Sequence, residues 1–139
     1  MTEPIAPGRK VVPIRWRDLD GFNHVNNAVF LSYLEEGRDA WLENALGEGI
    51  TELTEFVVRH VSIDFVSQMT QEDGDAIVTI EVESVGNSSI TLREIIHASS
   101  DNRLCASARG VLVHTNPEHT ESKRLPDDLR ARLEASIVA

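Results

Sequence analysis

One long helical segment, in a chain whose other segments alternate like strands, most constrains the fold. Between Asn27 and about Leu46, apolar residues recur at spacings of three and four. Asn26 or Asn27 can cap the start of this helix, and Gly47 or Gly49 can close its end. The apolar positions are Phe30, Leu34, Trp41 and Leu42, with Leu31, Ala45 and Leu46 near them; the charged residues on the other faces are Glu35, Glu36, Arg38, Asp39 and Glu43.

The remaining regular segments have the pattern of β-strands. We predict strands at 10–17, 56–66, 76–85, 90–98 and 104–114. The segment 56–66 alternates in a way that is typical of a strand with one buried face. The connections at 86–89 and 101–102 are short and polar, so the last three strands should form an antiparallel meander. A short C-terminal helix is expected from Pro126 through Ile137.

The order of these elements predicts an α+β fold. A helix that follows the first strand of an antiparallel sheet must lie across a face of that sheet to bury its apolar stripe. We therefore expect an antiparallel five-stranded sheet wrapped around one long central helix, with a short C-terminal helix added. The 139 residues suit a single domain, in which residues 1–9 and 117–139 are peripheral. A chain of this size encloses a large pocket poorly on its own, which favours sharing a pocket with a second copy.

Charge and cysteine content exclude several classes of function. The net charge of −10 and the lack of a basic run oppose binding to nucleic acid or to an anionic membrane. Cys105 is the only cysteine, so an intrachain disulfide and a cysteine-rich metal site are excluded, and a cytoplasmic protein is expected. Residues 1–13 lack the apolar stretch of a secretory signal, and no segment approaches the roughly 20 apolar residues of a membrane helix.

The ten residues Asp18–Asn27 concentrate the chain's polar chemistry just before the long helix. They hold two carboxylates, one imidazole and three carboxamides. This composition is typical of a catalytic turn at a helix start, although an ordinary strand-to-helix turn also uses such residues for capping. Asp18 should point away from Asp20, and we expect it to be structural, paired with Arg15 or Arg17. The side chains of Asn26 and Asn27 serve either as caps only or in the site.

A resemblance to a known family is carried by this turn and the helix after it. Residues 15–27, followed by Phe30–Arg38, resemble the opening of acyl-CoA thioesterases of the 4-hydroxybenzoyl-CoA thioesterase family, which have the hotdog fold. The similarity continues more loosely through 57–65, 74–75, 86–90 and 109–114. It implies hydrolysis of a thioester by a homodimer or a dimer of dimers, with each active site between two hotdog units.

Thioester hydrolysis assigns roles to the residues of the turn. The reaction needs a nucleophile or general base near the carbonyl carbon and a hydrogen-bond donor near the carbonyl oxygen. Asp20 can attack directly or activate water, and the free backbone amide of Asn27 at the helix start can supply the donor. The resemblance implies the same two positions. His24 can orient Asp20, bond a water or line the pocket, or it can cap local backbone. Asn26 is a candidate for substrate binding.

Coenzyme A is the expected thiol carrier, as part of the substrate and with no separate cofactor. In similar proteins the segment matching Gly86–Ser89 lies beside the pantetheine arm, which makes Ser88 and Ser89 candidates for contacting it. A basic residue that family members often carry is replaced here by Asn87, leaving Arg59, Arg93 or Arg109 to balance the CoA phosphates. Four further histidines lack ligand-like spacing, so no metal is expected; these are His60, His97, His114 and His119.

Other readings of the same residues stay open. Related hotdog thioesterases carry the catalytic carboxylate on the central helix, so Glu35 is a reserve candidate, although a solvated helix face explains Glu35 and Glu36 as well. A hotdog hydratase or dehydratase would use Asp20 and His24 as acid and base, but the Asn-Pro-x-His signature is missing. A non-catalytic acyl-CoA-binding module is the third reading. Four aromatic residues suit either an acyl tunnel or the core, namely Phe22, Phe30, Tyr33 and Phe65.

Overall fold

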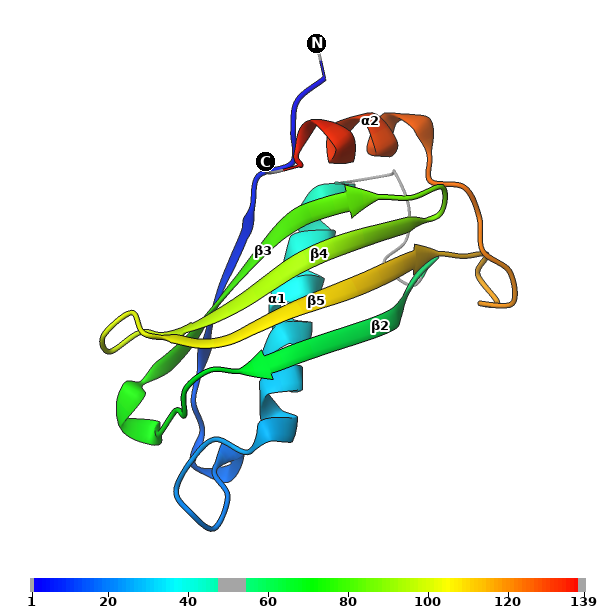
Figure 1. The fold of residues 1–139 in the computed structure, drawn as a ribbon. Helices are drawn as coiled ribbons and strands as arrows, with labels where there is room; N and C mark the ends of the chain where they lie inside the picture. The colour runs from blue at the N-terminus through cyan, green and yellow to red at the C-terminus, as the bar shows by residue number, and fades with distance from the viewer. Residues whose placement is uncertain (1, 48–54, 138–139) are drawn as a thin grey trace.

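The expected hotdog architecture is confirmed in the computed structural model, which describes residues 2–47 and 55–137. Five strands form one antiparallel sheet in the order β1-β3-β4-β5-β2, and the long helix α1 runs across one face of it (Figure 1). The elements are β1 (Gly8–Pro13), α1 (Asn27–Leu46), β2 (Phe56–Phe65), β3 (Asp75–Val85), β4 (Ser89–Ala98), β5 (Leu104–His114) and α2 (Asp127–Ala135).

The core lies between α1 and the sheet. Alternate residues of β3 and β4 are buried, as a strand with one face against a helix requires, and α1 buries its apolar stripe against them. Gly37 lets the helix approach β3 closely, because a Cβ at this position would collide with the side chain of Val78. No helix formed by the described residues is long and apolar enough to cross a membrane.

The first strand is shorter than expected. The predicted strand 10–17 ends at Pro13, and Trp16–Asp18 form a short 3-10 turn instead. The cause is the carboxylate of Asp18, which accepts the backbone N–H of Arg15 at 2.9 Å and turns the chain. The C-terminal helix likewise ends at Ala135 rather than Ile137. Of the two glycines expected to close α1, Gly47 does so with a φ of 61°, while Gly49 lies outside the described residues.

The strand β2 forms one edge of the sheet and is less buried than its pattern predicts. It pairs with β5 only, and Phe56 is its one buried residue. Arg59 lies at a bulge between Val58 and His60, exposed and without a partner in the register of β2 with β5. The expected burial of one face of β2 is therefore confirmed only in part. Val61 and Ile63 are half-buried and the residue between them is exposed, because α1 packs mainly against β1 and β3.

A buried ion pair joins α1 to the centre of the sheet. Arg38 was expected on the charged face of α1, but it is 6% exposed and donates from Nη1 to both carboxylate oxygens of Glu94, at 2.8 and 3.1 Å. Glu94 is fully buried on β4 beside Gly110, whose missing side chain leaves room for the carboxylate. Burial raises the pKa of Glu94, and the charge of Arg38 opposes this rise.

Candidate active site

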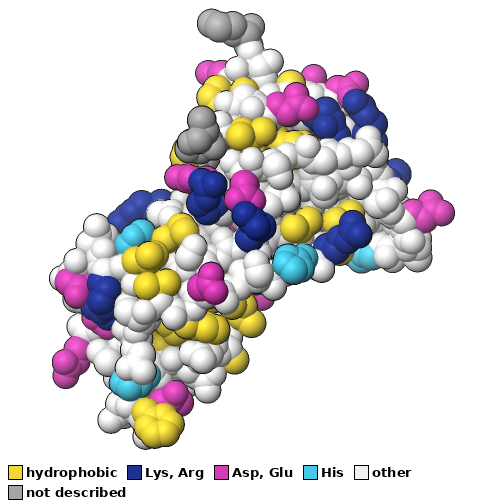
Figure 2. Space-filling view, in the orientation of Figure 1, with side chains coloured by type: hydrophobic (Ala, Val, Ile, Leu, Met, Phe, Trp, Pro, Cys, Tyr) yellow, Lys and Arg dark blue, Asp and Glu magenta, His cyan; other side chains and the backbone are white. Residues whose placement is uncertain are grey.

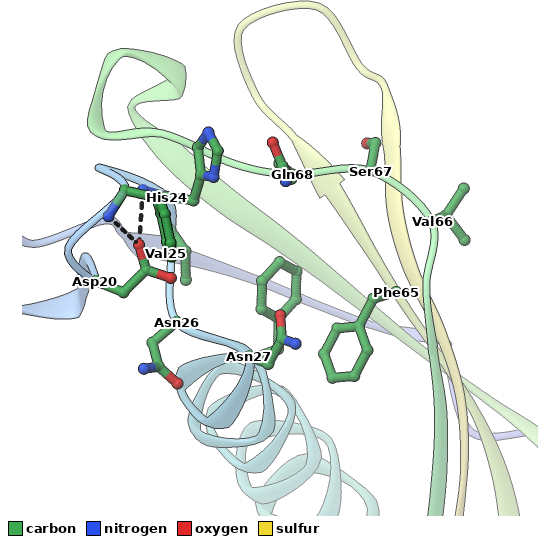
Figure 3. Close-up of a pocket in the computed structure, with 11 residues that line it drawn as sticks. Asp20, His24, Val25, Asn26, Asn27, Phe65, Val66, Ser67 and Gln68 are labelled. Atoms are coloured by element: carbon green, nitrogen blue, oxygen red, sulfur yellow. Dashed lines mark hydrogen bonds between the residues drawn. The ribbon is translucent and has the colours of Figure 1, made fainter.

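A pocket of about 930 Å³ opens where the predicted catalytic turn meets the start of α1 (Figure 3). Its second wall is the stretch that follows β2, residues 65–68. The volume suits a small-molecule ligand. The pocket is lined by Asp20, Phe22, His24, Val25, Asn26, Asn27, Phe30, Phe65, Val66, Ser67 and Gln68. The structure thus brings together Asp20, His24, Asn26 and Asn27, four of the seven site residues predicted from the sequence.

Asp20 presents one oxygen to its own turn and leaves the other available. Its Oδ1 accepts the backbone N–H of Phe22 at 2.8 Å and that of His24 at 3.3 Å (Figure 3). The turn is closed by Asn23, whose φ of 61° is a left-handed conformation that asparagine tolerates. Among the described residues, nothing donates a hydrogen bond to Oδ2 of Asp20. The carboxylate is therefore held in orientation while one oxygen remains able to attack or to accept a proton.

The neighbouring carboxylate has a structural role, as expected for Asp18. It is 2% exposed and accepts the hydroxyl of Tyr33 at 2.8 Å and the guanidinium of Arg15 at 3.1 Å. Burial raises the pKa of Asp18, but hydrogen bonds from the Arg15 backbone, Tyr33 and the Arg15 side chain outweigh it, so the pKa lies below its usual value. The carbonyl of Asp18 also accepts the backbone N–H of Asn26 at 2.9 Å. Asp18 therefore ties the turn to α1.

The two adjacent asparagines at the start of α1 have different roles, one through its side chain and the other through its backbone N–H. The side chain of Asn26 caps the helix by accepting the backbone N–H of Ala28 at 2.8 Å. Asn27 is the first helical residue, and in the described part of the chain its backbone N–H has no acceptor. This free amide lies at the positive end of the helix macrodipole, and it belongs to a residue that lines the pocket. A carbonyl oxygen that gains negative charge would be stabilised there.

His24 contacts Asp20 through its backbone. The N–H of His24 reaches Oδ1 of Asp20, whereas the imidazole ring extends away from that carboxylate toward the side of the pocket that holds Gln68 (Figure 3). The carbonyl of His24 accepts the backbone N–H of Asp20 at 2.8 Å. The ring is available to line the pocket.

Aromatic side chains form the apolar part of the pocket. Phe30 of α1 and Phe65 of β2 pack edge to face, with ring centroids 5.4 Å apart and planes at 87°. Phe22 lies at the mouth and is 81% exposed. Tyr33 lies outside this lining, because its hydroxyl bonds Asp18 on the other side of the turn. The contribution of Ser67 and Gln68 was not foreseen; their only signal is a polar pair directly after a strand.

The other predicted substrate-binding residues lie away from this pocket within one chain. Ser88 and Ser89 stand at the β3–β4 turn, at the opposite end of the sheet from the loop that leads into α1 (Figure 1). Arg59 is exposed at the β2 bulge. Arg93 and Arg109, which were expected to balance the CoA phosphates, are already in ion pairs. Both arginines pair with Glu83 on the sheet face that α1 leaves uncovered.

The reserve candidates on α1 lie outside the pocket. Glu35 and Glu36 are exposed, which agrees with a solvated helix face. Glu36 borders a separate cavity of about 300 Å³ together with Ser32 and Tyr33. The described residues contain no group of three or more His, Cys, Asp and Glu side chains placed to hold a metal ion.

Comparison with known proteins identifies relatives of this architecture. The chain matches the thioesterase-like superfamily over residues 14–133. It is 26% identical over 130 residues to the long-chain acyl-CoA thioesterase FadM of Escherichia coli, covering 91% of this chain and 96% of the relative. A predicted thioesterase from Bacillus stearothermophilus superposes with a TM-score of 0.82, at 28% identity over 96% of this chain and 98% of the other.

A second solved structure links the fold to a ligand. A thioesterase from Thermus thermophilus, complexed with coenzyme A and zinc, is 30% identical, covers 92% of each chain and superposes with a TM-score of 0.79. These matches span nearly the whole chain, and they confirm the expectation of an enzyme of the thioester hydrolase class. The chain belongs to the thioesterase-like superfamily.

Proposed function

We propose that this protein hydrolyses acyl-CoA thioesters to a free carboxylic acid and CoA. The observation that carries the proposal is the pairing of an oriented carboxylate, Asp20, with the free backbone N–H of Asn27 across one partly apolar pocket. These are the two groups that thioester hydrolysis requires. The FadM relative, named for long-chain acyl-CoA hydrolysis, and the CoA-bound Thermus relative support this substrate class.

Two routes are compatible with the geometry around Asp20. In the first, the free carboxylate oxygen attacks the thioester carbon, CoA leaves as a thiolate that takes up a proton, and water then hydrolyses the mixed anhydride. In the second, Asp20 accepts a proton from a water that attacks the same carbon, and the proton passes to the leaving thiolate. In both routes the N–H of Asn27 stabilises the oxyanion. Neither route requires a metal or a separate cofactor.

The CoA nucleotide would bind outside the pocket. The pocket lining holds one carboxylate and no lysine or arginine, so it offers no permanently charged cation to balance the phosphates. Arg59 is the remaining candidate of the three arginines considered for this role, since Arg93 and Arg109 are paired. Ser88 and Ser89 remain proposed contacts of the pantetheine arm. The narrower assignment to the 4-hydroxybenzoyl-CoA thioesterase branch is likewise kept as a proposal.

The free edge of β2 supports assembly into a homodimer. Within residues 2–47 and 55–137 its outer side has no strand partner, and it exposes apolar side chains, with Val58 at 47% and Phe65 at 45% exposure. Pairing two copies along β2, alone or as part of a dimer of dimers, would cover this edge and close the pocket beside Phe65. β3 cannot form such an edge-to-edge pair, because it lies inside the sheet between β1 and β4.

The buried cysteine and the mixed surface charges support a cytoplasmic location and small-molecule substrates. The single cysteine, Cys105, is buried, which suits a reducing compartment. Acidic and basic side chains are interspersed on the face drawn in Figure 2, without the continuous basic area that nucleic acid needs.

The test is hydrolysis of a panel of acyl-CoAs, from acetyl to palmitoyl with benzoyl and phenylacetyl added, followed by release of free thiol. We expect Asp20→Asn to lower kcat by about a thousandfold or more while the melting temperature holds. Asp128→Asn, the same change at an exposed carboxylate on α2 and outside the pocket, should leave kcat unchanged. Binding of acyl-CoA without thiol release by the wild type would contradict the proposal and favour a hydratase or a binding module.

A further inference from the structure

The second wall of the pocket is a stretch of irregular backbone between β2 and β3. Residues 66–69 form no strand, yet Val66, Ser67 and Gln68 line the pocket opposite Asp20. The backbone N–H groups of Val66 and Ser67 both donate to the carbonyl of Cys105, at 2.8 and 3.2 Å. Beyond them, the carbonyl of Met69 accepts the N–H of Val25 at 2.8 Å, which joins this wall to the catalytic turn.

One arginine from the β4–β5 connection fixes this wall. Arg103 donates from Nη2 to the carbonyl of Gln68 at 2.8 Å and from Nε to the hydroxyl of Ser67 at 3.2 Å. The same guanidinium donates to Asp73 at 3.0 Å and to Asp101 at 2.7 Å. Its planar fork therefore joins residues 67–68 and Asp73, which lie between β2 and β3, to the β4–β5 connection.

The carboxylate of Asp73 completes the anchor. It is 9% exposed and accepts the N–H of Thr70 at 2.8 Å and the hydroxyl of Ser100 at 2.6 Å, in addition to Arg103. Burial raises the pKa of Asp73, but hydrogen bonds from Ser100, Thr70 and Arg103 outweigh it and lower the pKa. Charge-assisted bonds of this kind are stronger and more directional than neutral ones. The ion pair between Asp73 and Arg103 therefore holds this wall in place.

We infer that Arg103 is a positioning residue that sets the width of the acyl pocket by fixing residues 66–69 against the catalytic turn. The inference rests on the proposed thioesterase function for its substrate. Arg103 bonds the wall but is not among the residues that line the pocket, so it has no part in the chemical step. Its loss should change which acyl groups bind, with little effect on the reaction once an acyl group is correctly seated.

The experiment compares Arg103→Met with the wild type over the acyl-CoA panel. We expect KM for the preferred acyl group to rise about fivefold to tenfold, discrimination between chain lengths to flatten, and kcat to stay within about twofold. Arg103→Lys, which can keep one or two of the bonds, should recover part of the selectivity. Hydrogen exchange measured over residues 64–70 should accelerate in Arg103→Met.

Arg132→Met is the matched control. Arg132 also joins distant segments through carbonyls, donating to Glu3 at 3.2 Å and to Ala45 at 3.3 Å, but it lies on α2, outside the pocket lining. Its loss should lower the melting temperature and leave the KM profile unchanged. A profile that shifts equally in both variants, or a uniform fall of kcat in Arg103→Met, would overturn the inference.

Turnover and binding separate this inference from the proposed function. If the wild type binds acyl-CoAs without hydrolysing them, the proposed function fails, and the dissociation constants for the same panel take the place of KM. A flattened chain-length dependence of binding in Arg103→Met would then still support the positioning role. Unchanged binding together with unchanged exchange over residues 64–70 would refute it.

Discussion

Two carboxylates lie next to α1 in opposite circumstances, Asp20 in the turn before its start and Glu94 of β4 beside its middle. At the start, Asp20 borders an open pocket, and its Oδ1 is occupied by two backbone N–H groups. In the middle, Glu94 is fully buried, and both of its oxygens receive Nη1 of Arg38. A carboxylate whose oxygens are both engaged in a dry interior has no room for a substrate, whereas a half-engaged one at a pocket can react. Accessibility and unfilled bonding capacity, more than charge, distinguish a catalytic carboxylate from a structural one.

The largest predicted effect comes from breaking the buried pair. Glu94→Gln leaves the guanidinium of Arg38 buried without its counter-charge, and we expect the free energy of unfolding to fall by about 3 to 5 kcal/mol. Urea denaturation at neutral pH measures this directly. In the catalytic turn, Asp20→Asn should change the free energy of unfolding by less than about 1 kcal/mol. The side-chain oxygen of asparagine can still accept the two backbone hydrogen bonds.

A double variant tests whether the loss comes from the unpaired charge. Replacing both partners, as Arg38→Met with Glu94→Leu, removes the charges together and should recover most of the stability lost in Glu94→Gln. If the double variant is as unstable as the single one, packing around Glu94 and Gly110 accounts for the effect instead of the ion pair.

A smaller effect is predicted at Tyr33, which supports the catalytic turn through Asp18. Tyr33→Phe removes the hydroxyl that bonds the Asp18 carboxylate at 2.8 Å, and we expect a loss of about 1.5 to 3 kcal/mol at neutral pH. Because the pKa of folded Asp18 is lowered, its contribution to stability is present above the unfolded pKa and is lost as pH falls through the folded pKa.

The pH dependence of the Tyr33→Phe variant follows from the lowered pKa of folded Asp18. The stability gap between wild type and Tyr33→Phe should be full at about pH 7 and should narrow toward about pH 3, which lies below the ordinary pKa of an aspartate and nearer to the lowered pKa of folded Asp18. Urea titrations at the two pH values measure the gap. A gap that stays constant over this range would mean that the lost hydroxyl acts through packing alone.

Local patterns in the sequence were sufficient for most of the fold. The bounds of α1 were predicted correctly because Asn26 and Gly47 mark its two ends with capping chemistry. Strand β5 was likewise predicted at its observed bounds, between the polar residues 101–102 and the irregular segment after His114. The first strand was predicted too long because the β-prone run continues past Pro13, and the bond from Arg15 to Asp18 that turns the chain has no signature in strand propensity.

Contacts between distant segments could not be predicted in the same way. The partner of Arg38 is 56 residues away on β4, and the periodicity of α1 alone placed this arginine on the charged face. The pocket wall at Ser67 and Gln68 depends on Arg103, which is 36 and 35 residues away. For the candidate site, the turn itself was predicted because Asp20 through Asn27 are adjacent in sequence, and the wall was missed because it is assembled by tertiary structure.

The smallest predicted effect separates the two asparagines at the start of α1. Asn26→Ala removes the cap on the N–H of Ala28 and should lower the free energy of unfolding by about 1 kcal/mol. Asn27→Ala retains the backbone N–H that the proposed mechanism uses, so kcat should stay within about threefold and stability within about 0.5 kcal/mol. Thiol release and urea titration on both variants give the comparison. A large loss of kcat in Asn27→Ala alone would move the oxyanion role from the backbone amide of Asn27 to its side chain.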